Sequence, residues 1–247
     1  MLRRLLPFVI ACVVLFGTGT ACAEGVSLAW SDCGAAGSTA RSFACNSNTG
    51  TDDLYLSFVP PTGVNAFYEI EAIVQVGTVD FAPVPDWWNF VSFTGCRRAS
   101  LLTTHNIPIS TGACVDPYAL APSTLTQQVA TALVLFGDGV TRRMQLRAVV
   151  TLAVADTLAL DPGTEYYGVR WRFNHTRTVG TGACAGCTQA MCLALGRVLL
   201  RSGPAQPVEF ALPQTAQHAV TWNGGSSCDR LVPVRNRTWG ALKSLYR

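Results

Sequence analysis

The stretch GVRWRFN, residues 168–174, decides the fold class of this chain. Its apolar residues Val169, Trp171 and Phe173 alternate with polar residues at positions 170, 172 and 174. Successive side chains of a β-strand point to opposite faces, so this alternation is typical of a strand with one buried and one solvated face. We therefore predict a strand here, in a sheet that covers a core with one face.

Two longer stretches show the same period of two. Apolar residues occupy every even position from 70 to 76 in residues 69–77, and every even position from 144 to 154 in residues 142–155. Turns rich in Gly, Pro, Asn and Asp separate these stretches from shorter candidate strands. The shorter candidates are residues 26–30, 54–59, 87–93, 131–136, 192–201, 208–212 and 218–222.

About ten short strands joined by such turns predict an all-β fold. We expect a two-sheet sandwich of Greek-key or jelly-roll style, formed by residues 24–247 as a single domain. One short helix is predicted near the C-terminus, where Thr238 can cap a turn that carries Trp239 and Leu242 on one face.

The first 23 residues have the three parts of a secretory signal peptide. Arg3 and Arg4 form a basic start, residues 5–16 an apolar core, and Ala21-Cys22-Ala23 a cleavage site. We expect cleavage before Glu24 and a secreted or periplasmic protein. Attachment of a lipid to Cys22 is the alternative, although residues 19–21 lack the usual leucine. No later stretch has the roughly 18 uninterrupted apolar residues of a transmembrane helix.

Eight cysteines remain after that cleavage, and an even number in an exported chain predicts disulfide bonds. These residues are Cys33, Cys45, Cys96, Cys114, Cys184, Cys187, Cys192 and Cys228. Their short separations favour the pairs Cys33–Cys45 and Cys96–Cys114, and the other four allow three pairings.

The spacing Cys184-x-x-Cys187 also matches half of a zinc site or a redox dithiol. No second Cys-x-x-Cys is present, and the flanking residues are typical of strands rather than of a thioredoxin-like alternation of strands and helices. Structural disulfides are the favoured interpretation. No metal or other cofactor is expected.

Patterns that support catalysis are few. The sequence has no Gly-x-Ser-x-Gly elbow, and His105, His175 and His218 lie in dissimilar contexts without ligand spacing. The Asn- and Asp-rich stretch at residues 46–53 lacks the Glu that closes an EF-type calcium loop, so a plain turn is favoured.

A carboxylate pair for sugar hydrolysis could be formed by Glu69 and Glu71. The two share one face of their predicted strand at about 7 Å, near the separation found in glycosidases. The opposite face carries the apolar residues, so we expect the pair to face solvent, where neither pKa would be raised for acid catalysis. We therefore predict a protein that is not an enzyme.

Trp87 and Trp88 are the candidate binding residues. If this segment is extended, one indole enters the core and the other points outward. An exposed indole can stack on a sugar ring or on another protein. A carbohydrate-binding module that uses one of these side chains is thus an alternative function.

Charge gives little indication of a partner. Removal of the signal peptide leaves a net charge of about +1, so a nucleic-acid partner is not expected. Residues 230–247 contain five basic residues and no acid, and this tail could dock on an acidic body.

Five short stretches resemble a group of uncharacterised secreted bacterial proteins of unknown function. They are VSLAWSDCG at 26–34, FACN at 43–46, SFVPP at 57–61, PDWW at 85–88 and RTWGALKSLYR at 237–247. The resemblance implies export and a disulfide-containing β-sandwich, but it assigns no site residue. We hypothesise a secreted, non-enzymatic protein of surface or extracellular assembly or recognition, whose partner is a glycan or another secreted protein. A secreted hydrolase is a further alternative.

Overall fold

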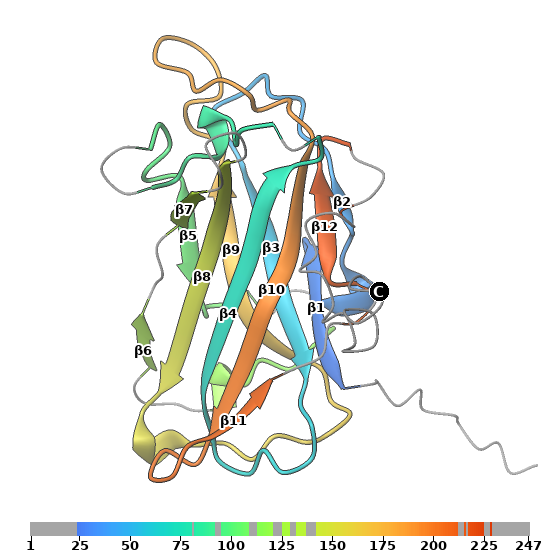
Figure 1. Cartoon of the computed structure of the whole chain (residues 1–247). Coiled ribbons are helices and arrows are strands. Elements are labelled where there is room, and N and C mark those ends of the chain that lie inside the picture. Colours follow the sequence, from blue (N-terminus) through green and yellow to red (C-terminus); the bar gives the residue numbers. More distant parts are fainter. Residues whose placement is uncertain are drawn as a thin grey trace, which may run out of the picture.

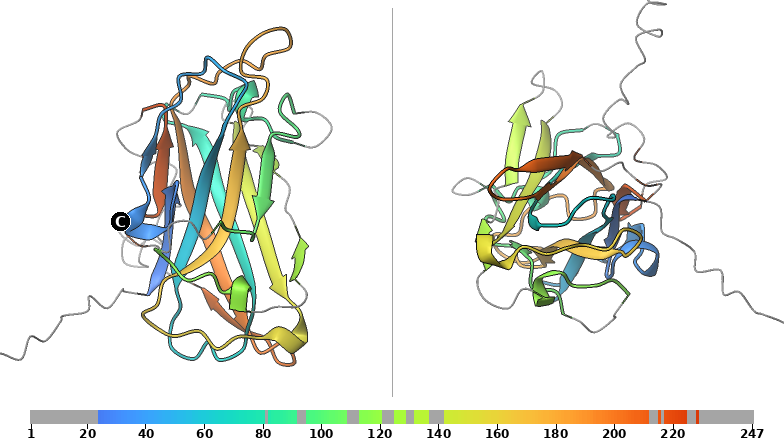
Figure 2. Two further views of the ribbon diagram at one scale, coloured as in Figure 1. Left: turned by 180° about the vertical axis from the view of Figure 1, so that it is seen from behind. Right: turned by 90° about the horizontal axis from the view of Figure 1, so that it is seen from below.

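A computed structural model shows two β-sheets packed face to face, which confirms the all-β sandwich (Figures 1 and 2). The structure describes residues 24–80, 82–91, 95–108, 113–120, 125–128, 132–136, 142–211, 215, 217–224 and 228. The expected signal peptide and C-terminal helix lie outside these residues. Within them, no helix has the length and apolar character needed to cross a membrane.

Sheet A has four strands in the order β1-β3-β9-β5, and all three neighbouring pairs are antiparallel. In that order the strands are Gly25–Trp30, Thr51–Val59, Tyr166–Asn174 and Leu101–Thr104. The stretch that identified the fold class lies in β9, in the middle of this sheet. Its three apolar residues are fully buried, which confirms the predicted buried face. The opposite face is less solvated than expected, because Arg170 is only 6% exposed.

Sheet B has eight strands in the order β2-β12-β10-β4-β8-β6, with β11 paired to β10 and β7 paired to β8. In chain order they are β2 Ala40–Arg41, β4 Phe67–Thr78, β6 Leu125–Gln128, β7 Ala132–Phe136, β8 Arg142–Leu152, β10 Met191–Ser202, β11 Val208–Ala211 and β12 Ala219–Trp222. Four short 3-10 helices connect the strands: η1 Gly34–Ala36, η2 Asp86–Trp88, η3 Tyr118–Leu120 and η4 Val154–Asp156.

One predicted strand is wrong and three short strands were not foreseen. Residues 87–93 were expected to form a strand, but Trp87 and Trp88 belong to η2. The unforeseen strands β2, β5 and β6 have two to four residues each, too few for a repeated alternation to stand out.

The core lies between the two sheets and is rich in aromatic side chains. Five tryptophans are fully buried there: Trp30, Trp87, Trp88, Trp171 and Trp222. Trp222 lies within 6 Å of three of the others, ring centre to ring centre. Each large side chain removed from water contributes up to about 3 kcal/mol, so this cluster is a main source of stability.

The first and last parts of the described chain close one side of the sandwich together. The outer edge of β1 exchanges backbone hydrogen bonds with residues 215–217: Leu28 N–H donates to the Gln217 carbonyl at 2.7 Å, and Thr215 N–H donates to the Val26 carbonyl at 3.1 Å. Trp30 Nε1 also donates to a carbonyl of β12, that of Thr221, at 3.0 Å. The edge of β1 is thereby covered.

The eight cysteines that follow the expected cleavage site all form disulfides, as predicted, but both predicted pairs are wrong. The bonds are Cys33–Cys114, Cys45–Cys187, Cys96–Cys184 and Cys192–Cys228. They join residues 36 to 142 positions apart, because strands distant in sequence are neighbours in the sheets. On the chain-entropy description such loops stabilise the fold by about 4–5 kcal/mol each.

Replacing Cys33 and Cys114 together by Ala should lower the free energy of unfolding by about 4 kcal/mol, because the reopened loop regains its chain entropy. Urea denaturation measures this loss. Peptide mapping of the parent protein under non-reducing conditions is the control. Recovery of a Cys33–Cys45 peptide pair would contradict the pairing described above.

Candidate functional site

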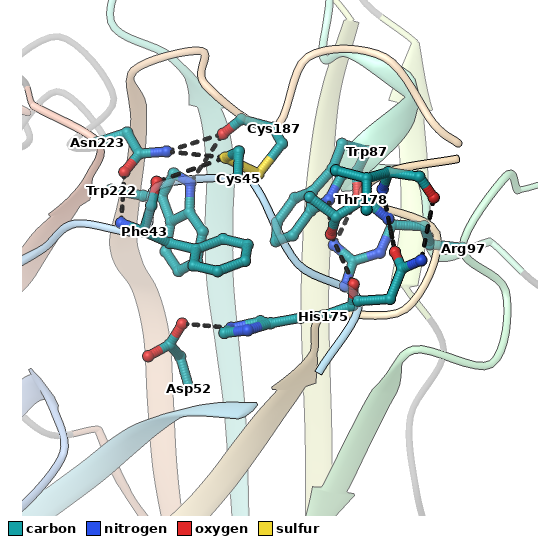
Figure 3. The surroundings of a disulfide bond; sticks show 12 residues. Phe43, Cys45, Asp52, Trp87, Arg97, His175, Thr178, Cys187, Trp222 and Asn223 are labelled. Carbon is teal, nitrogen blue, oxygen red and sulfur yellow. Dashed lines mark hydrogen bonds and ion pairs between the residues drawn. A yellow bond between two sulfur atoms is a disulfide. The ribbon is translucent and has the colours of Figure 1, made fainter. Parts of the chain in front are cut away.

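Three connections meet at one end of the sandwich, the upper end in Figure 1, which we call the loop end. They are residues 42–50 between β2 and β3, residues 79–100 between β4 and β5, and residues 175–190 between β9 and β10. Two disulfides and several buried polar side chains hold these connections together. Figure 3 shows one of the disulfides, Cys45–Cys187, with the side chains around it. This concentration of fixed contacts makes the loop end the candidate site.

Both disulfides of the loop end attach the connection at residues 175–190. Cys187 bonds to Cys45 in the first connection, and Cys184 bonds to Cys96 in the second. The two cysteines of the Cys-x-x-Cys spacing thus serve separate bridges and do not form a dithiol with each other. No group of three or more potential metal ligands is found among the described residues.

Two asparagine side chains fix the backbone of the same connection. Asn48 Oδ1 accepts hydrogen bonds from the backbone N–H of Thr178 at 2.7 Å and of Val179 at 3.0 Å, while Asn48 Nδ2 donates to the Val179 carbonyl at 3.0 Å. Asn223 Nδ2 donates to the Cys187 carbonyl at 2.9 Å. Asn48 from the first connection and Asn223 from the end of β12 thus hold this backbone, so the shape of the loop is set without a ligand.

His175 and Asp52 form a buried pair beneath these loops (Figure 3). His175 Nε2 lies 2.7 Å from Asp52 Oδ2, and Nδ1 lies 2.9 Å from the Thr49 carbonyl oxygen. The Phe43 ring stacks on the imidazole at 3.8 Å between centres, and Arg41 Nε donates to the other Asp52 oxygen. Each ring nitrogen of His175 thus lies within hydrogen-bond distance of a protein oxygen, which fixes the orientation of the imidazole.

Arg97 is a buried cation, with 1% of its surface exposed. Its Cζ lies 3.4 Å from the centre of the Trp87 ring, and its two terminal nitrogens donate to the carbonyls of Trp87 and Asn174. Burial lowers the pKa of the guanidinium to about 9, which leaves it charged at neutral pH. Arg97 therefore joins the second connection to the end of β9 by cation–π stacking and hydrogen bonds.

The candidate binding residues Trp87 and Trp88 are both fully buried, so the expected outward indole is wrong. The segment is a 3-10 helix, in which neighbouring side chains do not point in opposite directions, and both rings enter the core. Trp87 stacks on Trp222 at 5.2 Å and its Nε1 donates to Thr178 Oγ1 at 3.0 Å. Neither ring offers a surface to a ligand.

The other candidate groups have protein partners. Glu69 and Glu71 were expected to face solvent, but both are largely covered and share Arg201, and Arg147 Nη2 lies 2.9 Å from Glu71. His218 Nδ1 lies 2.8 Å from the Thr215 carbonyl oxygen. The stretch at residues 46–53 supplies Asn48 and Asp52 to the loop end.

No sequence pattern indicates that Asp52 meets His175, because 123 residues separate them and neither lies in a recognisable motif. The same holds for Arg97, whose partners are backbone carbonyls that any residue could supply. Only the odd placement of a charged pair beside Cys96, as Cys96-Arg97-Arg98, singles out this turn.

Comparisons with known proteins do not assign a family. No protein-family model matches the chain, and no curated protein matches its sequence. Among solved structures, the fold is similar to a cohesin module from a Clostridium perfringens family 33 glycoside hydrolase. The TM-score is 0.34 and the identity 8%, over 81% of this chain and 98% of that one. At these values the likeness supports no inference about function.

Replacing Asp52 by Asn should lower the free energy of unfolding by about 2–4 kcal/mol, because His175 and Arg41 then lose a buried charged acceptor. Thermal and urea unfolding measure the change. Asp86→Asn is the matched control: Asp86 is exposed at the same end, and its loss should change stability by no more than about 0.5 kcal/mol. Equal effects of the two variants would contradict the structural role of Asp52.

Replacing Arg97 by Lys should cost about 2 kcal/mol of stability, because an ammonium cannot stack on Trp87 and reach two carbonyls at once. The exposed neighbour Arg98 provides the control, since Arg98→Lys should be neutral within about 0.5 kcal/mol. Urea denaturation of both variants checks the difference. If Arg97→Lys leaves the free energy of unfolding unchanged, the planar guanidinium group is not needed at this position.

Proposed function

We propose that this protein is a secreted, non-catalytic module that binds another secreted protein through its loop end. One observation carries the proposal: the exposed tip of the connection at residues 175–190 is fixed by two disulfides, by Asn48 and by the buried layer beneath it. A loop that is ordered before binding loses less entropy on binding, which is how rigid scaffolds present recognition loops.

The composition of the tip suits recognition. Residues 179–183 are exposed, and they combine one apolar side chain, Val179, with the small residues Gly180, Thr181, Gly182 and Ala183. Both glycines have positive φ, and a Cβ added to either would meet nothing within 4 Å. Asn48 binds the N–H and the carbonyl of Val179, and the Ala183 N–H donates to the Gly180 carbonyl at 3.1 Å. The backbone groups of Thr181 and Gly182 form no hydrogen bond with a residue that the structure describes, so they are open to a partner.

The candidate acid and base groups already have protein partners, which supports a binding rather than a catalytic role. His175 has an acceptor at each ring nitrogen, and Glu69 and Glu71 are neutralised by Arg201 and Arg147. A general acid or base needs an atom within reach of substrate. Export is supported by the expected signal peptide and by the four disulfides, which form in oxidising compartments.

Position-specific photo-crosslinking tests this function. Val179 and Val208 are exposed apolar residues, 36% and 54% accessible, at opposite ends of the sandwich (Figure 1). Each is replaced in turn by p-benzoylphenylalanine in the full chain, and the protein is irradiated in a culture of its source organism. We expect a discrete protein adduct from position 179 and none from position 208.

Adducts of equal yield from both positions, or none from position 179, would overturn the assignment of the loop end. A discrete adduct from position 208 alone would move the recognition surface to the opposite end of the sandwich.

A further inference from the structure

We propose that the outer face of sheet A next to the loop end binds an acidic, partly apolar segment of the partner protein. This inference rests on the proposed function and names the chemistry of the partner. Four arginines carry it: Arg170 and Arg172 on β9, Arg98 in the turn before β5, and Arg177 just after β9. We call them the arginine strip.

Strand register places two of the four arginines on one surface, and contacts beyond the strand ends bring the other two next to it. Arg170 and Arg172 alternate with the buried Trp171 and Phe173, so they project from the outer face of sheet A. Beyond the end of β9 the surface continues through Ser100, whose carbonyl accepts the Asn174 N–H at 2.8 Å.

The hydroxyls of Ser100 and Thr176 lie 2.7 Å apart on this continuation. Arg177 Nη1 donates to the Cys96 carbonyl at 2.6 Å, which places Arg177 against the turn that contains Arg98. The strip therefore runs from the middle of sheet A onto the loop end.

Positive charge on the strip exceeds its described negative charge. Asp53 bonds to Arg172 through two contacts of 2.8 Å, and its Oδ2 lies 3.8 Å from Arg170 Nη1. Arg98 and Arg177 are exposed and form no ion pair with any residue that the structure describes. Among the described ion pairs of the strip, one carboxylate thus neutralises part of the charge of Arg170 and Arg172, and none neutralises Arg98 or Arg177.

Arg170 adds a further sign of incomplete pairing. The residue is 6% exposed, yet its buried Nε has no hydrogen-bond partner among the described residues. A buried donor without an acceptor is costly, and a carboxylate brought to this face would place negative charge near it.

The outer face of sheet B differs. There Arg147 and Arg201 contact three carboxylates, those of Glu69, Glu71 and Glu209. Arg197 lies on the same face and forms no ion pair with a described residue, so three described arginines stand against three carboxylates there. The strip, with four arginines and one carboxylate, carries the larger excess of positive charge.

An apolar side chain within the strip favours a polypeptide as the occupant. Leu102 is 52% exposed and lies directly opposite Arg172 in the β5–β9 register. A protein segment can offer carboxylates to the guanidinium groups and an apolar side chain to Leu102, whereas an acidic polysaccharide supplies only the charge. Arginine also binds carboxylates with two parallel hydrogen bonds, which suits acidic side chains.

Fluorescence anisotropy with the full mature chain tests the proposal. The probe is a labelled peptide of sequence EELEELEE, and the comparison probes are QQLQQLQQ and an oligogalacturonate. We expect the acidic peptide to bind most tightly and to weaken as salt screens the charges. Arg98→Glu combined with Arg177→Gln should weaken binding about tenfold, while leaving thermal unfolding unchanged.

Arg197→Glu is the control, because Arg197 is exposed on β10 of sheet B and forms no ion pair with a described residue. It changes the net charge by two units, against three for the double variant. An equal loss of affinity in this variant would reduce the effect to overall charge and overturn the assignment. Absence of peptide binding, or tighter binding of the oligogalacturonate, would also overturn it. Should the double variant fail to fold, the peptide affinity of Arg177→Gln alone is compared with that of Arg197→Glu.

The failure of this inference can be told apart from failure of the proposed function. If the adduct at position 179 forms equally in the Arg98→Glu, Arg177→Gln background, the loop end still recognises a partner but the partner is not selected by acidic groups. If no adduct forms although the peptide binds the strip, the proposed function fails and the strip is a separate surface.

Discussion

Burial of every second side chain between two sheets is the constraint on which the rest of this structure depends. Along β9, β4 and β8 one set of residues enters the core and the other stays outside, so the position of each outer residue follows from the register of the inner ones. Arg170 and Arg172 share a face because Trp171 and Phe173 must be buried. The same constraint places the ends of β3, β9 and β10 at one end of the sandwich.

At that end the core changes character, from apolar packing to buried polar contacts. Asp52, His175 and Arg97 are removed from water, and each is stabilised by hydrogen bonds, by a neighbouring charge or by an aromatic ring. Such contacts have directional requirements that apolar packing lacks. They therefore fix the connections above them in one geometry, and the disulfides of Cys184 and Cys187 add a covalent limit to movement.

The long strands of this fold were predictable from sequence, whereas the structure of the loop end was not. The strands from 168 to 174, 69 to 77 and 142 to 155 were recognisable because alternation repeats over several residues in each. Trp87 and Trp88 were misplaced because two adjacent apolar residues carry no period, and a 3-10 helix can bury both.

The disulfide pairing failed for a different reason. Proximity in sequence suggested Cys33–Cys45, but strand order places Cys33 beside Cys114 and Cys45 beside Cys187. The meeting of Asp52 with His175 depends on the same long-range order. A local pattern therefore identified which residues are buried or bridged, whereas their partners required the whole topology.

The shared closure of the sandwich by β1 and residues 215–222 has a consequence for biogenesis. β1 lies at the start of the described chain, yet the backbone of Val26 and Leu28 at its outer edge, and the Trp30 indole, bond to backbone groups of residues 215, 217 and 221. β12 and the centrally placed Trp222 likewise complete the core last. A chain that emerges N-terminus first therefore cannot close this sandwich until residues up to 222 have been synthesised, so the final pairing of β1 waits for the last described strand.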